Sequence, residues 1–255
     1  MLHTFEFNNK KLSDIGAVLM ENPHYTLSVK ELDFTALPGK SGDIITDKNR
    51  FKNSSISYKV SSMPLFCSYT EQEFVYVLSE WLLTSYDYKI LRDTYNPGYF
   101  RKAICTDIAN PTVEASGVVW TTVTFNCDPF RYSDSGLQKR TFNASYSNIS
   151  DRYIVNKAIL RNSEKWESEP IIEIIPSSSA TMSLKINETS VAVYDTDKTI
   201  IIDVPNRNVY DTDGEPCNDL IEALELPVLL PGNNEITASG TGSYTVKITP
   251  NWRRL

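Results

Sequence analysis

Most of the chain alternates apolar and polar residues with a period of two, which is the pattern of half-buried β-strands. Clear examples are residues 5–7, 25–29 and 56–60. Residues 116–127 carry β-branched and aromatic side chains on both faces, which predicts a central strand covered on both sides. The pattern therefore predicts a mainly β protein.

One segment, residues 70–86, has the spacing of a helix instead. Thr70 is a good N-cap, and Glu73 stands at the capping-box position three residues later. The apolar residues of the expected buried face are Phe74, Val75, Leu78, Trp81 and Leu82. At this spacing we interpret Trp81 as a core residue rather than as a residue that stacks on a ligand.

The alternation fails between residues 35 and 55, which are polar, glycine-rich and charged. Connections of this length in compact domains are usually functional or disordered. Pro38-Gly39 and Ser41-Gly42 supply the fixed and permissive φ angles of tight bends. Because strands flank the segment, we expect a long projecting connection or an extended hairpin that acts as an arm and needs a partner.

A second strand-rich block follows a change in composition after Pro129. Several short strands separated by turns are typical of a β-sandwich. We therefore expect two β domains, residues 1–135 and 136–255. The expected strands of the second domain are 171–175, 182–186, 191–194 and 199–204, with a hairpin over residues 234–249 that turns at Gly240-Thr-Gly242.

Charge and hydropathy exclude several classes of partner. The chain has 32 acidic and 25 basic residues and a formal charge of −7, whereas general nucleic-acid-binding proteins are usually basic. No run approaches the ~20 apolar residues of a membrane helix, so we expect no membrane insertion. The first residues alternate and lack the apolar core of a signal peptide, so we expect no cleaved export signal.

Catalytic candidates are few. The two histidines, His3 and His24, and four cysteines without a CxxC pair do not form a zinc, iron or catalytic-triad pattern. We expect the cysteines to be free and mostly buried. Asp203 is interpreted as a carboxylate that hydrogen-bonds a turn, and residues 211–215 lack the spacing of a calcium loop. The prediction is a protein that is not an enzyme and has no cofactor or metal.

Short motifs along the whole chain resemble the distal tail protein (Dit) family of siphophages that infect Gram-positive bacteria. They are FEFNNKKLSDIGAVL near the N-terminus, LPGKSGD at 37–43, NPGYFRKA at 96–103, FNCDPFRY at 125–132, LPVLLPGNNEI at 226–236, then Gly240 and PNWR at 250–253. Two departures from the family pattern are Lys40 and Ser41, which replace the usual Arg and Asp. Residues 161–166 also lack a glycine that many relatives carry.

The resemblance implies a ring-forming N-terminal β-sandwich-like domain with one helix and an extended arm, followed by a galectin-like C-terminal β-sandwich. It implies a hexameric ring at the virion tail tip, made in the host cytoplasm, that joins the tail tube protein and the tape-measure end to the baseplate or tail fibre during host adsorption. In that ring the arm residues are expected to contact the neighbouring subunit. They are Pro38, Gly39, Lys40, Ser41, Gly42, Asp43, Asp47, Lys48 and Arg50.

The C-terminal motif is interpreted structurally. Pro231 and Gly232 stop and turn the chain, Asn233 or Asn234 hydrogen-bonds the turn, and Trp252 buries its ring to hold the end of the chain. An alternative function is a carbohydrate-binding module for host cell-wall saccharide, with Trp166 and Tyr194 as exposed aromatic candidates. A glycoside hydrolase would need two paired carboxylates, and the sequence pairs none.

Overall fold

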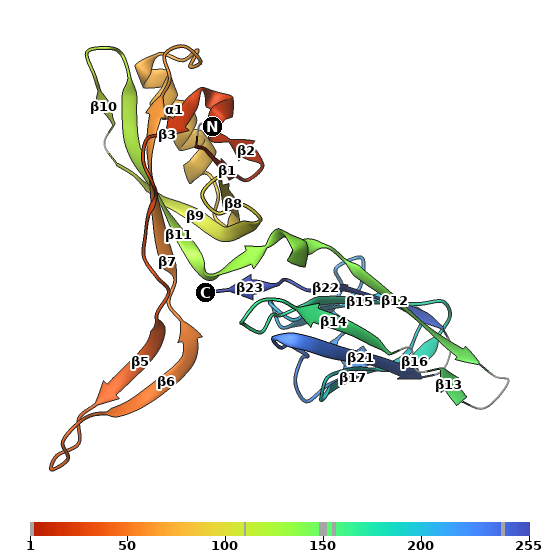
Figure 1. Ribbon diagram of the computed structural model, residues 1–255. Helices are drawn as coiled ribbons and strands as arrows, with labels where there is room; N and C mark the ends of the chain where they lie inside the picture. The colour runs from red at the N-terminus through yellow and green to blue at the C-terminus, as the bar shows by residue number, and fades with distance from the viewer. Residues whose placement is uncertain (1–2, 110, 148–151, 155–156, 241–242) are drawn as a thin grey trace. The chain divides into compact units, whose positions relative to one another are not determined.

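The computed structural model describes residues 3–109, 111–147, 152–154, 157–240 and 243–255 (Figure 1). The chain divides into two compact units, Met1–Arg131 with Leu255, and Tyr132–Arg254. The boundary expected after residue 135 falls in the short 3-10 helix η2 (Asp134–Leu137). Strands dominate both units, and the described residues contain one α-helix. The mainly β fold predicted from the alternation is confirmed.

The first unit is built on one large antiparallel sheet with the order β2-β1-β8-β9-β11-β7-β3. Strand β11 lies inside the sheet and pairs with β7 from Trp120↔Ser61 to Cys127↔Ser54. Two short strands join at its margins, because β10 pairs with β11 and β4 pairs with β7. The strands are β1 (Phe5–Phe7), β2 (Lys10–Lys11), β3 (Ala17–Leu19), β4 (His24–Tyr25), β7 (Ser54–Ser62), β8 (Lys89–Asp93), β9 (Tyr99–Ile108), β10 (Thr112–Val113) and β11 (Val119–Ser133). The short strand β23 (Arg253–Arg254), which pairs with β11, belongs to the second unit.

Helix α1 (Glu71–Leu83) packs against this sheet and supplies Phe74, Leu78 and Leu82 to the core. Thr70 caps the helix and forms the predicted capping box with Glu73, so the predicted start is confirmed. The helix ends at Leu83, earlier than the expected 86. The 3-10 helix η1 (Leu12–Ile15) adds Leu12 and Ile15 to the same core.

An aromatic cluster fills the core between α1 and the sheet. Phe125 lies within 5.1–6.0 Å of the rings of Phe5, Phe7 and Tyr58. Trp81 stacks on Phe5 at 5.6 Å, and its indole N–H donates to the Phe7 carbonyl at 3.0 Å. The interpretation of Trp81 as a core residue therefore agrees with its position.

The second unit is a β-sandwich of two sheets that share one apolar core. One sheet has the order β13-β12-β22-β15-β18-β19 and the other the order β14-β21-β16-β17-β20. The predicted strands at 171–175, 182–186, 191–194 and 199–204 correspond to β15, β16, β17 and β18. The strands are β12 (Arg140–Ser147), β13 (Arg152–Ile154), β14 (Ala158–Asn162), β15 (Ile171–Pro176), β16 (Ala180–Ile186), β17 (Thr189–Thr196), β18 (Ile200–Asp203), β19 (Asn208–Tyr210), β20 (Ile221–Glu222), which follows η3 (Asn218–Leu220), β21 (Gly232–Gly240) and β22 (Tyr244–Thr249).

The expected hairpin over residues 234–249 is wrong. Strand β21 belongs to one sheet of the sandwich and β22 to the other, so the chain crosses between layers. Both strands turn alternate apolar residues toward the shared core, which gives the same sequence pattern as a hairpin. Gly240 allows a close approach here, because a Cβ on it would lie 2.2 Å from the Thr181 carbonyl oxygen. The expected turn residues Thr241 and Gly242 lie outside the described residues.

Two further expectations about strands change. Residues 114–117 form a turn, in which Gly117 N–H donates to the Glu114 carbonyl at 2.9 Å, and the central strand begins at Val119 and extends to Ser133. The strand expected at 25–29 is also wrong in large part, because only His24–Tyr25 pairs as β4. Its apolar side chains face solvent.

Candidate functional site

A two-stranded hairpin projects from the sheet of the first unit (Figure 1, orange). It consists of β5 (Lys30–Thr35) and β6 (Ile44–Phe51), with Phe34 opposite Ile45 and Thr35 opposite Ile44. Every residue from 33 to 50 is exposed. A two-stranded hairpin without a second layer is marginally stable in water. Of the two forms expected from the sequence, a long projecting connection or an extended hairpin, the arm has the form of a hairpin.

The turn at the tip follows the chemistry of its residues. The Lys40 N–H donates to the Leu37 carbonyl at 3.2 Å, with Pro38 and Gly39 between them. Gly39 and Gly42 have φ angles of 79° and 85°, which side chains disfavour. Proline followed by glycine suits the two central positions of a type II turn. The expected tight bends are present at both glycines.

Three of the expected arm charges are paired inside the hairpin. The Lys30 ammonium lies 2.9 Å from Asp47, Lys48 lies 3.0 Å from Asp33, and Arg50 lies 2.8 Å from Glu31. Hydrogen bonds from the Lys30 ammonium and the Asn49 N–H lower the pKa of the Asp47 carboxyl. Within the described ranges Lys40 and Asp43, near the tip, have no ion partner. A role of these charges between subunits stays a prediction.

A bulge bends the hairpin near its base. The register shifts between the pairs Lys30↔Phe51 and Leu32↔Asp47, so β6 has extra residues there. Asn49 takes a left-handed conformation with φ of 55°, and its N–H donates to the Asp47 carboxylate at 2.9 Å. Bulges of this kind bend a strand and increase its twist.

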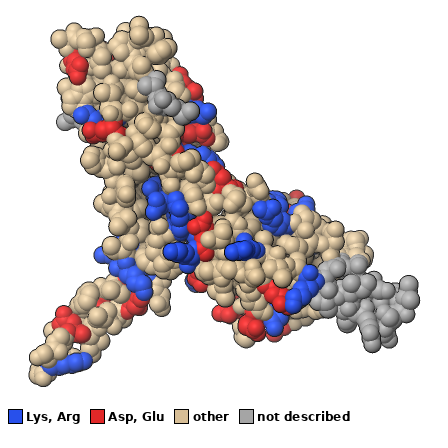
Figure 2. Space-filling view, in the orientation of Figure 1, with Lys and Arg blue, Asp and Glu red and all other residues tan. Residues whose placement is uncertain are grey.

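Uncharged side chains cover much of the hairpin surface. Phe34 and Ile45, directly opposite each other, are each 61% exposed. Figure 2 shows the hairpin as mostly uncharged, with separate acidic and basic patches. Sequence reasoning missed both residues because it treated the segment as polar. The sequence did contain a signal for these exposed residues. An aromatic residue and a pair of isoleucines flank the turn, and no predicted element covers them.

The segment before the hairpin also exposes apolar side chains. Tyr25, Leu27 and Val29 are 60%, 71% and 56% exposed. The intervening Thr26 exchanges hydrogen bonds with Ser55 of β7 at 2.8 and 2.9 Å. Ser28 donates to the Pro129 carbonyl at 2.8 Å. Thr26 is itself exposed and Ser28 is half-buried, so both kinds of side chain in this alternating segment are reached by solvent.

The base of the hairpin is held to the sheet. The Lys52 N–H donates to the Val29 carbonyl at 2.9 Å. Phe51 packs edge-on against Phe130 with ring centroids 5.8 Å apart. The hairpin thus has an anchored root and an exposed distal part.

The C-terminal motif has a structural role. Asn234 is fully buried; its amide donates to the carbonyls of Leu230 at 2.8 Å and Leu160 at 3.2 Å, and its oxygen accepts from the Leu230 N–H at 2.7 Å. Of the two asparagines considered, Asn234 therefore holds the turn, while Asn233 and Pro231 are exposed and Gly232 has a φ of 90°. Trp252 is buried in the core of the sandwich, as expected.

Groups with catalytic potential are used structurally. Asp203 accepts hydrogen bonds from the Asn206 backbone and side chain at 3.1 and 2.9 Å, as interpreted from the sequence. The four cysteines are free, and burial raises the pKa of Cys105 to about 11 and of Cys127 to about 12. Such thiols are protonated at neutral pH and are poor nucleophiles. Within the described part of the chain no three His, Cys, Asp or Glu residues gather as a metal site.

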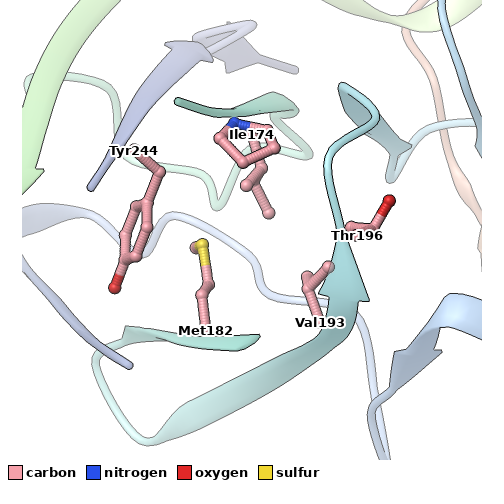
Figure 3. A pocket seen from close by; sticks show the side chains of 6 residues that line it. Ile174, Met182, Val193, Thr196 and Tyr244 are labelled. Atoms are coloured by element: carbon pink, nitrogen blue, oxygen red, sulfur yellow. The ribbon is translucent and has the colours of Figure 1, made fainter. Parts of the chain in front are cut away.

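A small cavity lies in the core of the sandwich (Figure 3). Its volume is about 10 Å³, and apolar side chains including Ile174, Met182 and Val193 line it. A space of this size holds at most one water molecule. It is a packing void and is too small for a sugar ring. The two saccharide-stacking candidates lie elsewhere, with Trp166 half-buried and Tyr194 exposed and donating its hydroxyl to Glu222.

Membrane insertion has no helical candidate in the structure. Across the ranges described above, α1 and the short 3-10 helices are the helical elements, and none is long and apolar enough to span a bilayer.

Comparison with known proteins identifies the fold. The chain is similar to the crystal structure of the SPP1 Dit protein, described as a paradigm of the hub adsorption apparatus in phages that infect Gram-positive bacteria, with a TM-score of 0.69, 15% identity and 100% of both chains covered. It is similar to a chain of the phage P2 baseplate in its activated conformation with Ca, with a TM-score of 0.54, 9% identity and 97% and 98% of the two chains covered. A strontium form of the p2 baseplate matches with a TM-score of 0.53 and 10% identity over 100% of this chain and 98% of that chain.

Comparisons of sequence add no further relative. No protein-family model matches the chain, and no curated protein matches it. At 9–15% identity the structural likeness shows the fold, and this fold is the one that the short motifs predicted.

Proposed function

We propose that this chain is a structural subunit of a phage tail tip, which assembles as a hexameric ring and joins the tail tube and tape-measure end to the baseplate or tail fibre. The observation that carries the proposal is the full-length likeness to the SPP1 hub protein, with 100% of both chains covered. The second neighbour is a baseplate component. The first neighbour is described as a paradigm of a hub adsorption apparatus and the second as part of a phage baseplate, and neither is described as an enzyme.

The hairpin supports assembly as the mode of action. Its exposed residues do not bury a core of their own, and among the strands that the structure describes β5 and β6 pair only with each other, which leaves both edges open to pairing. Contacts in which an element of one subunit binds a different surface of the next are heterologous, and they close into a ring when the rotation permits. A projecting hairpin on a rigid sheet is suited to such a contact.

The chemistry of the remaining candidates supports a role without catalysis. Asp203 holds a turn, and Cys105 and Cys127 are buried protonated thiols. We therefore propose binding surfaces, rather than a catalytic cleft, as the functional part of the molecule.

Assembly is tested on the purified full chain. Negative-stain electron microscopy and mass photometry at increasing protein concentration should show six-fold rings with a central hole. A protein that remains monomeric at every concentration, and forms no ring, would contradict the proposal.

A hairpin-deleted variant sharpens this test. Lys30 and Phe51 are register partners, so residues 31–50 can be replaced by Asn-Gly, which closes a two-residue turn between paired strands. We expect this variant to keep the circular dichroism spectrum and melting behaviour of the folded chain and to lose the ring. Rings formed by the deleted variant would show that the hairpin is not the assembly element.

A further inference from the structure

The loop between β7 and α1 presents large apolar side chains on a backbone that is held in place. Leu65 and Phe66 are 88% and 68% exposed. The N–H groups of Phe66 and Cys67 donate to the Met63 carbonyl at 2.9 and 2.7 Å. The Met63 N–H in turn donates to the Gly16 carbonyl at 2.9 Å. A Cβ on Gly16 would lie 2.4 Å from the Phe66 carbonyl oxygen, so the loop rests directly on this glycine.

A groove of about 270 Å³ opens beside this loop. The buried Phe74 and Val119 and the partly exposed Tyr69 supply its apolar lining, and Thr70 and Glu71 line it at the start of α1. This volume is below the roughly 300–1,000 Å³ of sites for drug-sized molecules, and it suits a side chain of a bound segment.

The opposite wall of the groove is the turn between β10 and β11, where Ser116 and Gly117 line it. A Cβ on Gly117 would lie 3.7 Å from a Glu71 carboxylate oxygen, so the two walls stand close together. The buried Ser62 hydroxyl at the end of β7 accepts from the Val119 N–H at 2.9 Å. In Figure 1 the loop and this turn lie at the end of the sheet opposite to the projecting hairpin.

The surroundings of the groove are acidic. Residues 62–74 and 112–119 contain no lysine, arginine or histidine and three glutamates, which are Glu71, Glu73 and Glu114. Glu71 lines the groove, and Glu114 accepts from the Ser116 hydroxyl at 3.5 Å. Among the residues that the structure describes, neither Glu71 nor Glu114 forms an ion pair.

The start of α1 does not favour an anion in the groove. The N-terminus of a helix attracts negative charge when its first N–H groups are free. Here Thr70 and Glu73 form the capping box, and Glu71 adds a second carboxylate to the first turn. The local field therefore favours a cation.

We propose that this groove docks a basic segment of a different protein, with an apolar side chain of that segment in the groove beside Leu65 and Phe66 and its lysine or arginine side chains against Glu71 and Glu114. Adjacent large apolar side chains that charged groups surround are typical of a protein interaction site. The inference goes beyond the proposed function, because the ring does not require this surface.

Charge favours a different protein over a second copy of this chain. The chain carries a formal charge of −7, so two copies that meet at an acidic surface bring like charges together. A basic segment instead gains from the carboxylates and from the apolar contacts at the same time.

A display library of short random peptides, panned on the purified full chain, is the probe. We expect the enriched peptides to carry lysine or arginine on both sides of a leucine, phenylalanine or tryptophan. Synthetic fluorescein-labelled copies then give a dissociation constant by fluorescence polarisation, and this constant should rise with NaCl concentration. No enrichment, or enrichment of acidic peptides, would overturn the inference.

Two variants separate the apolar part of the contact from the charged part. Phe66→Ser should raise the dissociation constant by at least about tenfold. Glu71→Gln combined with Glu114→Gln should also raise it and should flatten its dependence on salt. The matched controls are Leu224→Ser and Glu225→Gln in the second unit, which should bind the peptide as the wild type does. All five side chains are exposed, so every variant should keep its melting temperature.

Charge reversal gives the sharpest comparison. Glu71→Lys combined with Glu114→Lys should lose the selected peptide and should bind a copy in which glutamate replaces each lysine and arginine. Binding that survives both Phe66→Ser and charge reversal overturns the inference, as does an equal loss in the two control variants.

The remaining outcomes separate the inference from the proposed function. A selected peptide that breaks wild-type rings into monomers shows that a second copy occupies the groove, and it overturns the choice of a different protein. A wild-type chain that forms no ring but binds the peptide at this groove contradicts the proposed ring and supports the inference.

Discussion

The projecting hairpin and the C-terminal sandwich are built from the same alternation of side chains, yet only the sandwich has a core. In the sandwich, Ile172, Val246 and Ile248 from one sheet are almost fully buried against residues of the other sheet. In the hairpin, Phe34 and Ile45 face each other across the strands and remain 61% exposed. The difference is the second layer, which the hairpin lacks.

This comparison teaches that a period of two predicts the two faces of a strand without predicting what covers either face. The hairpin is held by its backbone ladder and by ion pairs such as Lys30–Asp47, and exposed ion pairs contribute little to stability because water screens them. The hairpin therefore leaves apolar side chains exposed and free to contact another surface, whereas the sandwich uses its apolar side chains in its own core.

The largest effect is expected from the same substitution at a buried and an exposed phenylalanine. Phe125→Ala removes a fully buried ring that contacts Phe5, Phe7 and Tyr58, and should lower the free energy of unfolding of the first unit by about 3–5 kcal/mol. Phe34→Ala should change it by less than about 0.5 kcal/mol. Urea unfolding followed by fluorescence measures both, and equal losses would remove the distinction between core and hairpin.

A smaller effect is expected at the asparagines of the C-terminal motif. Asn234→Ala leaves the buried carbonyl of Leu160 and the partly buried N–H and carbonyl of Leu230 without their side-chain partner, and should cost about 2–3 kcal/mol. Asn233→Ala, at an exposed neighbour, is the matched control and should cost less than about 0.5 kcal/mol. Thermal unfolding of the second unit measures both, and a neutral Asn234→Ala would show that the turn does not depend on this amide.

Local chemistry made several elements predictable from sequence. Thr70 and Glu73 form the capping box that starts α1, and the bends at Gly39 and Gly42 follow from residues that tolerate positive φ. These features depend on neighbours within a few positions along the chain. The helix and the hairpin turn were therefore predictable without knowledge of the tertiary fold.

Features that depend on distant partners were not predictable. Strands β21 and β22 look like a hairpin in sequence, but each pairs within a different sheet. The segment at 25–29 alternates as a buried strand does, but Thr26 and Ser28 find hydrogen-bond partners at Ser55 and Pro129, which are far along the chain. Periodicity does not distinguish these arrangements.

The candidate site was predicted in position and missed in detail. The arm lies where the alternation fails, but Asp47, Lys48 and Arg50 pair with residues of β5 that the sequence did not connect to them. Because these three charges are paired within the hairpin, the exposed apolar residues and the charges near the tip remain as candidates for contact with a partner. Their exposure depends on the missing second layer, which no local pattern reveals.

Changes at the bulge of the hairpin should affect the stability of the hairpin alone. Asn49 has a φ of 55°, where a residue with a Cβ and no compensating side-chain bond costs about 1 kcal/mol relative to the right-handed region. Asn49→Ala should speed amide hydrogen exchange of β5 and β6 severalfold, and Asn49→Gly should not. Global unfolding should stay unchanged in both variants, and a shift in the global transition would show that the hairpin is coupled to the core.

The smallest effect is a difference in acid response between two similar carboxyls. Asp47 in the hairpin accepts from Lys30 and from the N–H two residues later, and Asp211 in the sandwich accepts from Lys198 and from the Asp213 and Glu215 N–H groups. These hydrogen bonds lower the pKa of both carboxyls below the ordinary value. The two carboxyls differ in location. Asp211 holds a loop of a packed unit, whereas Asp47 holds a hairpin that no second layer covers.

A lowered pKa in the folded state means that the carboxyl stabilises the fold above its unfolded pKa of about 3.9, and that this contribution is lost as the pH falls through the folded value. The melting temperature of the second unit should therefore be higher in the wild type than in Asp211→Asn at pH 7, and the gap should close as the pH falls below about 4. Asp47→Asn should leave both melting temperatures unchanged at every pH and instead speed amide exchange in the hairpin at neutral pH. A gap for Asp211→Asn that widens on acidification would reverse the sign of the argument, and a global acid effect of Asp47→Asn would show that the hairpin and the packed units unfold together.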